Sequence, residues 1–104
     1  MQRVAFIMRI KPGTQEEYRR RHQQVWPELV TDLKRAGCQN YSIYLRGTEL
    51  FAYMEVEDFQ RYLEIMEASR ASQRWETKMS DILIRETEAD TGFPPVLDEV
   101  FHLE

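Results

Sequence analysis

His22 is the side chain of this sequence best suited to moving a proton near neutral pH. The ordinary pKa of imidazole is about 6.5, so the ring can both accept and donate a proton under cellular conditions. Tyr18 lies four residues before it and Trp26 four residues after it, in the charged stretch E-E-Y-R-R-R-H-Q-Q-V-W-P-E-L. Residues four apart are neighbours on a helix, so Tyr18 could present its hydroxyl to the same substrate. The spacing indicates an acid–base site, if these side chains share a face turned away from water.

Residues 15–36 predict the helix that carries this histidine. Thr14 and Glu17 have the S/T-x-x-E spacing of a capping box, which predicts that the helix begins just after the threonine. Gly37 suits the left-handed position that follows a helix end. Pro27 lies inside the segment and has no N–H to donate, so we expect it to kink or divide the helix.

A helical projection places His22 within an apolar arc. At about 100° per residue, its neighbours in that arc are Tyr18, Val25, Leu29 and Leu33. His22 is therefore predicted not to face bulk water. Two interpretations remain open: a hydrogen-bonded histidine that fills space between Tyr18 and Trp26, or a cleft histidine that transfers protons.

Aromatic side chains give a second indication of the ligand. Sugars present flat patches of C–H with hydroxyls around the rim, and phenol and indole rings offer an apolar face and a polar edge to match. The rings predicted within reach of a cleft between sheet and helices are Tyr41, Tyr44, Trp26 and Trp75. Core packing is the alternative for each ring, and it is favoured for Tyr44 and Trp26.

Three strand patterns accompany the first helix. Residues 4–10 alternate as a strand, and residues 40–45 and 50–56 form a predicted hairpin. These strands carry large apolar residues on both sides, as Phe6 and Ile7 illustrate. A sheet that is apolar on both faces is seldom left bare to water, so we expect a homodimer packed sheet against sheet.

Two further helical patterns and a final strand complete the chain. Asp58 can cap a helix, and a later helical face is formed by Trp75, Met79, Ile82 and Leu83. Residues 86–95 predict an irregular loop and residues 96–103 a last strand. The order β-α-β-β-α-(α)-β is that of the split βαβ, or ferredoxin-like, fold of the α+β class, with an antiparallel sheet and helices on one face.

Length and charge limit the possible partners. A chain of 104 residues suffices for a single domain, which we assign to residues 1–104. Its net charge of −4 disfavours both nucleic acid and anionic membranes as partners. The single Cys38 cannot form an internal disulfide, and the five-residue apolar run before Arg9 is too short for a signal peptide or membrane span. We therefore expect a cytoplasmic protein.

Metal and nucleotide cofactors find no support in the sequence. His22, His102 and Cys38 lack metal-ligand spacing, and no glycine-rich phosphate loop is present. We therefore predict no cofactor.

Five blocks together resemble the L-rhamnose mutarotase family: E-E-Y-R-R-R-H, V-W-P-E-L, N-Y-S-I-Y-L, Q-R-W and E-V-F-H-L. They occur in order along nearly the whole chain. The resemblance implies a dimeric α+β barrel of ferredoxin-like protomers that interconverts the α and β anomers of L-rhamnose by acid–base ring opening and closure, without metal or organic cofactor. The rivals are a cofactor-free monooxygenase or haem-degrading enzyme of the same barrel type, and a non-catalytic sugar-binding module.

The resemblance also implies roles for individual residues. His22 becomes the proton donor, Tyr18 and Tyr41 contact the sugar, and Trp75 is a substrate-binding ring. The family commonly has a second tryptophan after this one, where this sequence has Glu76. Its carboxylate could accept hydrogen bonds from sugar hydroxyls, or it could face solvent. The general base stays open among Tyr18, Tyr41 and an ordered water.

Overall fold

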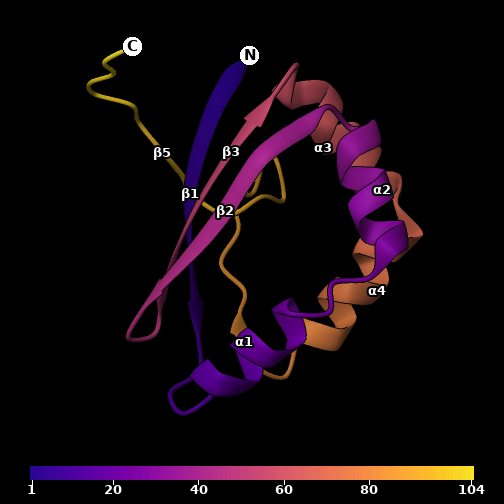
Figure 1. The fold of residues 1–104 in the computed structure, drawn as a ribbon, viewed down its shortest axis with the longest axis vertical. Helices are drawn as coiled ribbons and strands as arrows, with labels where there is room; N and C mark the ends of the chain where they lie inside the picture. The colour runs from indigo at the N-terminus through magenta and orange to yellow at the C-terminus, as the bar shows by residue number, and fades with distance from the viewer.

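An antiparallel sheet carries all the helices on one of its faces in the computed structural model, which describes residues 1–104 (Figure 1). The elements in chain order are β1 (Gln2–Ile10), α1 (Gln15–His22), α2 (Pro27–Arg35), β2 (Cys38–Arg46), β3 (Glu49–Val56), α3 (Phe59–Ala68), α4 (Arg70–Met79), β4 (Leu83–Ile84) and β5 (Val96–Leu97). The strand order is β2-β3-β1-β4, and β5 also pairs with β1. Because β3 lies between β1 and β2, the predicted split βαβ arrangement is confirmed.

The core lies between the sheet and the helices. Alternate residues of the central strands point to the helices and are buried: Val4, Phe6 and Ile10 on β1, and Leu50, Ala52, Met54 and Val56 on β3. This is the period of two that the strand patterns predicted. None of the helices is long and apolar enough to cross a membrane.

The predicted long helix is divided at Pro27. Helix α1 ends at His22, and α2 begins with Pro27 at its first position, where the missing N–H costs nothing. Gly37 follows α2 with φ of 81°, as predicted. The division leaves α1 only eight residues long, so contacts with other elements must hold it in place.

The predicted capping box at the start of α1 is wrong. The Thr14 hydroxyl donates to the backbone oxygen of Lys11 at 2.6 Å and caps no helical N–H. Its backbone has φ of −107° and ψ of 9°, which is not the extended conformation usual for a capping residue. Glu17 instead binds the arginines of its own helix, with Arg21 Nε at 2.7 Å.

The last of the predicted helices, α4 in the structure, is shorter than predicted. Asp58 caps α3 as expected, by accepting from the Arg61 N–H at 3.2 Å. Helix α4, however, ends at Met79, so Ile82 and Leu83 do not extend its face. The backbone oxygen of Ile82 accepts from Lys11 N–H at 2.8 Å, which draws the chain out of the helix and into pairing with the end of β1.

The final strand is also shorter than predicted. Only Val96–Leu97 pairs with β1, and residues 98–104 leave the sheet without regular structure (Figure 1). Strand structure requires a neighbour for the backbone, and this segment finds none within one chain. Its apolar side chains are therefore left in solvent: Val100, Phe101 and Leu103 are 94%, 78% and 80% exposed.

Candidate active site

A cavity of about 960 Å³ lies between the sheet and the helices. Its lining combines apolar side chains of the core with a few polar groups, which is the usual character of a small-molecule site. All five residues predicted to form the site belong to this lining: Tyr18, His22, Tyr41, Trp75 and Glu76. They come from α1, β2 and α4, so the fold brings together blocks that are far apart in the sequence.

His22 is part-buried at the C-terminal end of α1. Its ring stacks on Tyr18, with centroids 4.1 Å apart, and meets the Trp75 ring edge-on at 5.4 Å. The prediction that it avoids bulk water is confirmed. Trp26 does not follow His22 one turn later on the same helix, because α1 ends at His22. The four-residue spacing therefore does not make these two residues neighbours.

The hydrogen bond of His22 defines which ring nitrogen can react. Nδ1 lies 3.0 Å from the backbone oxygen of Tyr18, and since a carbonyl can only accept, Nδ1 carries the hydrogen. Burial lowers the pKa of His22 below its ordinary value, and the bond to Tyr18 offsets part of that effect. The neutral ring therefore prevails near pH 7, and Nε2 is the atom available to take up a proton.

Tyr18 presents its phenol from the same helix, one turn before His22. The residue is only 6% exposed, and burial raises the pKa of its hydroxyl to about 12. The hydroxyl therefore stays protonated at neutral pH and can donate a hydrogen bond into the cavity.

Tyr41 reaches the cavity because of a bulge in β2. Gln39 pairs with Glu55 and Ser42 pairs with Tyr53, so β2 has one more residue than β3 between these pairs. Asn40 takes up the extra residue with φ of 51°, a left-handed conformation that asparagine tolerates better than most residues. If Asn40 were paired regularly opposite Met54 and no bulge formed, Tyr41 would point to the other face of the sheet.

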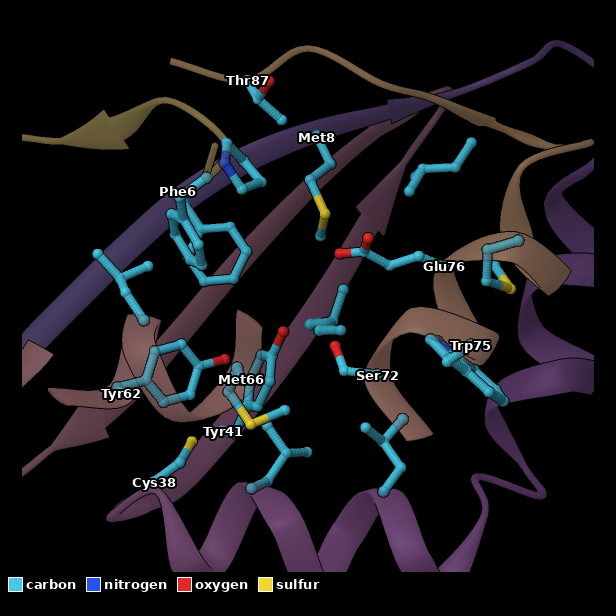
Figure 2. A pocket seen from close by; sticks show the side chains of 18 of the residues that line it. Phe6, Met8, Cys38, Tyr41, Tyr62, Met66, Ser72, Trp75, Glu76 and Thr87 are labelled. Carbon is cyan, nitrogen blue, oxygen red and sulfur yellow. The ribbon is translucent and has the colours of Figure 1, made fainter. Parts of the chain in front are cut away.

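The Tyr41 hydroxyl faces into the cavity (Figure 2). The residue is 36% exposed, and its ring lies 6.2 Å from that of Phe6. Burial raises the pKa of Tyr41 well above its ordinary value, and the neighbouring Tyr62, Tyr18 and Cys38 add to the rise. It too remains a neutral donor.

Trp75 forms one wall of the cavity beside His22. Its ring meets that of Trp26 edge-on at 5.1 Å, and the Lys78 ammonium lies 5.5 Å and 5.8 Å from the centroids of Trp26 and Trp75. Trp26 supports Trp75 from behind and does not line the cavity, as the packing interpretation predicted. Tyr44 is not in the core: it is 65% exposed and outside this cavity, because it points to the opposite face of the sheet.

Comparison with known proteins identifies the family. A family model described as L-rhamnose mutarotase matches residues 3–103 of the chain. The chain belongs to the L-rhamnose mutarotase family. It is 37% identical to the L-rhamnose mutarotase of Oceanobacillus iheyensis, with all of both chains covered, and 44% identical to that of Listeria monocytogenes serotype 4b, with 99% of each covered.

The fold agrees with this membership of the L-rhamnose mutarotase family. A crystal structure of L-rhamnose mutarotase from Formosa agariphila superposes with a TM-score of 0.80 at 31% identity, and all of both chains are covered. The resemblance predicted from the five sequence blocks is thereby confirmed.

Glu76 is the point where this member departs from the family pattern of two tryptophans. Its carboxylate projects from α4 into the cavity, alongside Ser72 one turn earlier (Figure 2). The residue is also partly open to solvent, and its Oε2 accepts a hydrogen bond from the exposed Arg85 at 2.9 Å. The other carboxylate oxygen stays free to accept from a ligand hydroxyl.

Arg21 helps to position helix α1 in this mutarotase-family site, although the sequence around it did not indicate this role. Within R-R-R it looked solvent-exposed, yet its side chain is only 12% exposed. It binds Glu17 at 2.7 Å, Asp81 at 2.9 Å and 3.0 Å, and the backbone oxygen of Lys78 at 2.8 Å. These bonds tie α1 to the end of α4 and so hold His22 against Trp75. No local pattern could have shown a partner sixty residues away.

Proposed function

We propose that this protein is an isomerase that interconverts the α and β anomers of L-rhamnose, with His22 as the proton-transferring residue and no metal or organic cofactor. The observation that carries the proposal is the convergence of Tyr18, His22, Tyr41 and Trp75 on one cavity in a chain of this family. All the residues involved belong to one folded unit, so we assign the whole activity to a single domain of residues 1–104.

Anomer exchange requires two coupled proton transfers. The ring oxygen must gain a proton while the C1 hydroxyl loses one, so that the ring opens to the aldehyde. Rotation about the C1–C2 bond and the reverse transfers then close the ring to the other anomer. An acid and a base must therefore flank the anomeric carbon within hydrogen-bond distance of its two oxygens.

His22 is suited to exchange a proton with the C1 oxygen of the sugar. Because the resting ring is neutral with Nδ1 bonded to Tyr18, its Nε2 takes the proton from the C1 hydroxyl during ring opening. The imidazolium so formed returns that proton to the carbonyl oxygen as the ring closes. This proposal makes His22 the base of ring opening, in place of the acid role implied by the family resemblance, and His22 acts as the acid only as the ring closes.

A tyrosine hydroxyl is suited to exchange a proton with the ring oxygen of the sugar. Tyr18 and Tyr41 both stay protonated at neutral pH, since burial raises the pKa of each. Either can donate its proton as the C1–O5 bond breaks and recover it on closure, which balances the transfer through His22. Trp75 offers its ring to the C–H face of the sugar, and Glu76 can accept from a hydroxyl.

Exchange of L-rhamnose anomers in the NMR spectrum tests the proposed function. Saturation of one anomeric proton should transfer to the other at a rate proportional to protein concentration, above the spontaneous rate. Binding of L-rhamnose without faster exchange would identify a sugar-binding module instead. The absence of both would contradict the proposal.

The pH dependence of this exchange should report the protonation of His22. With neutral imidazole as the working form, the protein-dependent rate should rise with pH through a pKa below 6.5 and then stay level, since the pKa of His22 is lowered. The rate is measured by NMR between about pH 4.5 and 8.5 after the spontaneous rate is subtracted. A rate that falls as pH rises through this range would instead require the imidazolium as the working form.

We also propose that the protein is a homodimer that packs through the outer face of the sheet. That face exposes Tyr44 and its cross-strand neighbour Phe51, and the nearby β5 exposes Val96 and Leu97. Together with the apolar tail, these side chains make a surface that a soluble protein rarely leaves uncovered. A reducing compartment, the cytoplasm, fits the single buried Cys38.

Sedimentation should find about twice the protomer mass of 12.5 kDa at micromolar concentration. Phe51→Lys, which places a charge in the middle of the outer face, should shift the protein toward the monomer. Glu28→Lys on the helical side is a charge-change control that should not. A wild-type protein that sediments as a monomer would contradict the dimer.

A further inference from the structure

Tyr62 on α3 brings a further hydroxyl to the cavity. Its residue is only 6% exposed, and its ring is held between aromatic neighbours, with Phe59 stacked at 6.2 Å and Phe93 edge-on at 6.4 Å. The hydroxyl points into the cavity, toward the space shared with Tyr41, Ser72 and Glu76 (Figure 2). Packing therefore accounts for an aromatic ring at residue 62, but it does not account for the hydroxyl group that the ring carries.

The Tyr62 oxygen has no hydrogen-bond partner within the protein. No side-chain oxygen or nitrogen is both sealed from solvent and unpaired, so this hydroxyl is open to the cavity and not enclosed by packing. Hydroxyls of largely buried residues are almost always hydrogen-bonded, either to the protein or to a molecule beside them. Phenylalanine would fill the same ring space without requiring such a partner. The partner of this hydroxyl is therefore a molecule inside the cavity.

The polar groups around Tyr62 indicate what kind of molecule this is. Hydroxyls of Tyr41 and Ser72 can donate or accept, and Glu76 can accept. The carboxylates of the lining, Glu67, Glu76 and Glu86, outnumber its cations, Lys34 and Arg85, and Arg85 is paired with Glu76 at 2.9 Å. Burial keeps the pKa of Tyr62 above its ordinary value, with Cys38 and Glu76 adding to the rise, so its hydroxyl is neutral. Such a set favours a neutral ligand with several hydroxyls over an anion.

Tyr62 and His22 lie toward opposite ends of the cavity. Tyr62 packs in the core cluster around Phe6 and Cys38, whereas Tyr18, the stacking partner of His22, packs in the cluster around Ile10. A sugar whose anomeric carbon is at His22 can therefore extend its remote hydroxyls toward Tyr62.

We propose that Tyr62 is a further substrate-binding residue, which hydrogen-bonds a sugar hydroxyl remote from the anomeric centre. The proposal rests on the proposed function, since it takes the cavity ligand to be the monosaccharide. It adds to the site a residue from α3, an element that supplies none of the residues predicted from the sequence.

Tyr62→Phe removes the oxygen and keeps the ring. The Kd for L-rhamnose, measured by calorimetry, should rise on the order of tenfold, the loss expected for one hydrogen bond in a dry site. The saturated exchange rate should fall by less than the affinity, because the remote contact is similar in ground and transition states. Tyr53→Phe is the matched control: its hydroxyl donates to Glu55 at 2.8 Å outside the cavity, and its loss should leave the Kd unchanged.

Deoxy sugars separate a direct contact from a structural effect. Wild-type protein should bind one of 2-, 3- and 4-deoxy-L-rhamnose markedly more weakly than L-rhamnose, whereas Tyr62→Phe should bind that sugar and L-rhamnose about equally. An unchanged Kd in Tyr62→Phe, or an equal loss for L-rhamnose and all three deoxy sugars, would overturn the assignment. Failure of the wild type to bind or exchange L-rhamnose would instead count against the proposed function.

Discussion

Replacing His22 by asparagine should lower the protein-dependent exchange of L-rhamnose anomers by about 10²-fold or more, the usual contribution of a positioned acid or base. The asparagine amide is similar in size and can still donate to the backbone oxygen of Tyr18, now 3.0 Å from Nδ1, so the local structure should persist. L-Rhamnose should still bind, held by Tyr41 and Trp75. The exchange rate by NMR, the Kd and the melting temperature are measured on one preparation.

A purely structural role for His22 predicts the inverse result. The melting temperature would then fall while exchange per folded molecule stayed near the wild-type value, and that outcome would falsify the catalytic assignment. His102→Asn is the matched control, because His102 is the other histidine of the chain and lies in the exposed C-terminal segment. It should leave both the exchange rate and the Kd unchanged.

Trp75→Ala is expected to raise the Kd for L-rhamnose by roughly 10–100-fold, since truncation of an aromatic anchor commonly costs about 2 kcal/mol or more. The saturated exchange rate should fall by less, if the ring contacts ground and transition states alike. Equal losses in affinity and in rate would mean that Trp75 acts mainly by supporting His22, whose ring it meets at 5.4 Å.

Two companion variants separate these roles of Trp75. Trp26→Ala removes the ring that supports Trp75 from behind but does not line the cavity, so it should lower the melting temperature with little change in Kd. Glu76→Trp restores the second tryptophan of the family pattern and should not abolish exchange. It breaks the bond to Arg85, which is exposed and remains solvated.

The parts of the fold that the sequence predicted well depend on local chemistry. The alternation along β1 shows which side chains are buried, because one face of the strand packs on the helices. Pro27 divides the helix for a reason intrinsic to proline, its missing N–H. His22 was correctly placed away from water by its spacing from Tyr18, but the other apolar residues of the predicted arc lie beyond the end of α1.

The parts that could not be predicted depend on partners distant in the sequence. Thr14 and Glu17 match a capping box, but the turn before α1 and the arginines within it take both side chains. Arg21 looked like a solvated charge because its partner, Asp81, is brought near only by the complete fold. The contribution of Tyr62 was hidden for another reason: a helix pattern shows that the ring is buried but not where its oxygen points.

The bulge at Asn40 also limits how strand β2 can change over evolution. Deletion of Asn40 would remove the bulge and place Tyr41 opposite Met54, so both parts of the strand would keep their facing. If Asn40 were kept but paired regularly opposite Met54, the part of the strand after it would be turned over relative to the part before it. Tyr41 and Ile43 would leave the cavity, while Ser42 and Tyr44 would enter it. Within a regularly paired part of a strand, loss or gain of two residues preserves the facing of the side chains, whereas loss or gain of one reverses it. Strand β2 can therefore shorten by one residue only where the bulge already supplies an extra one.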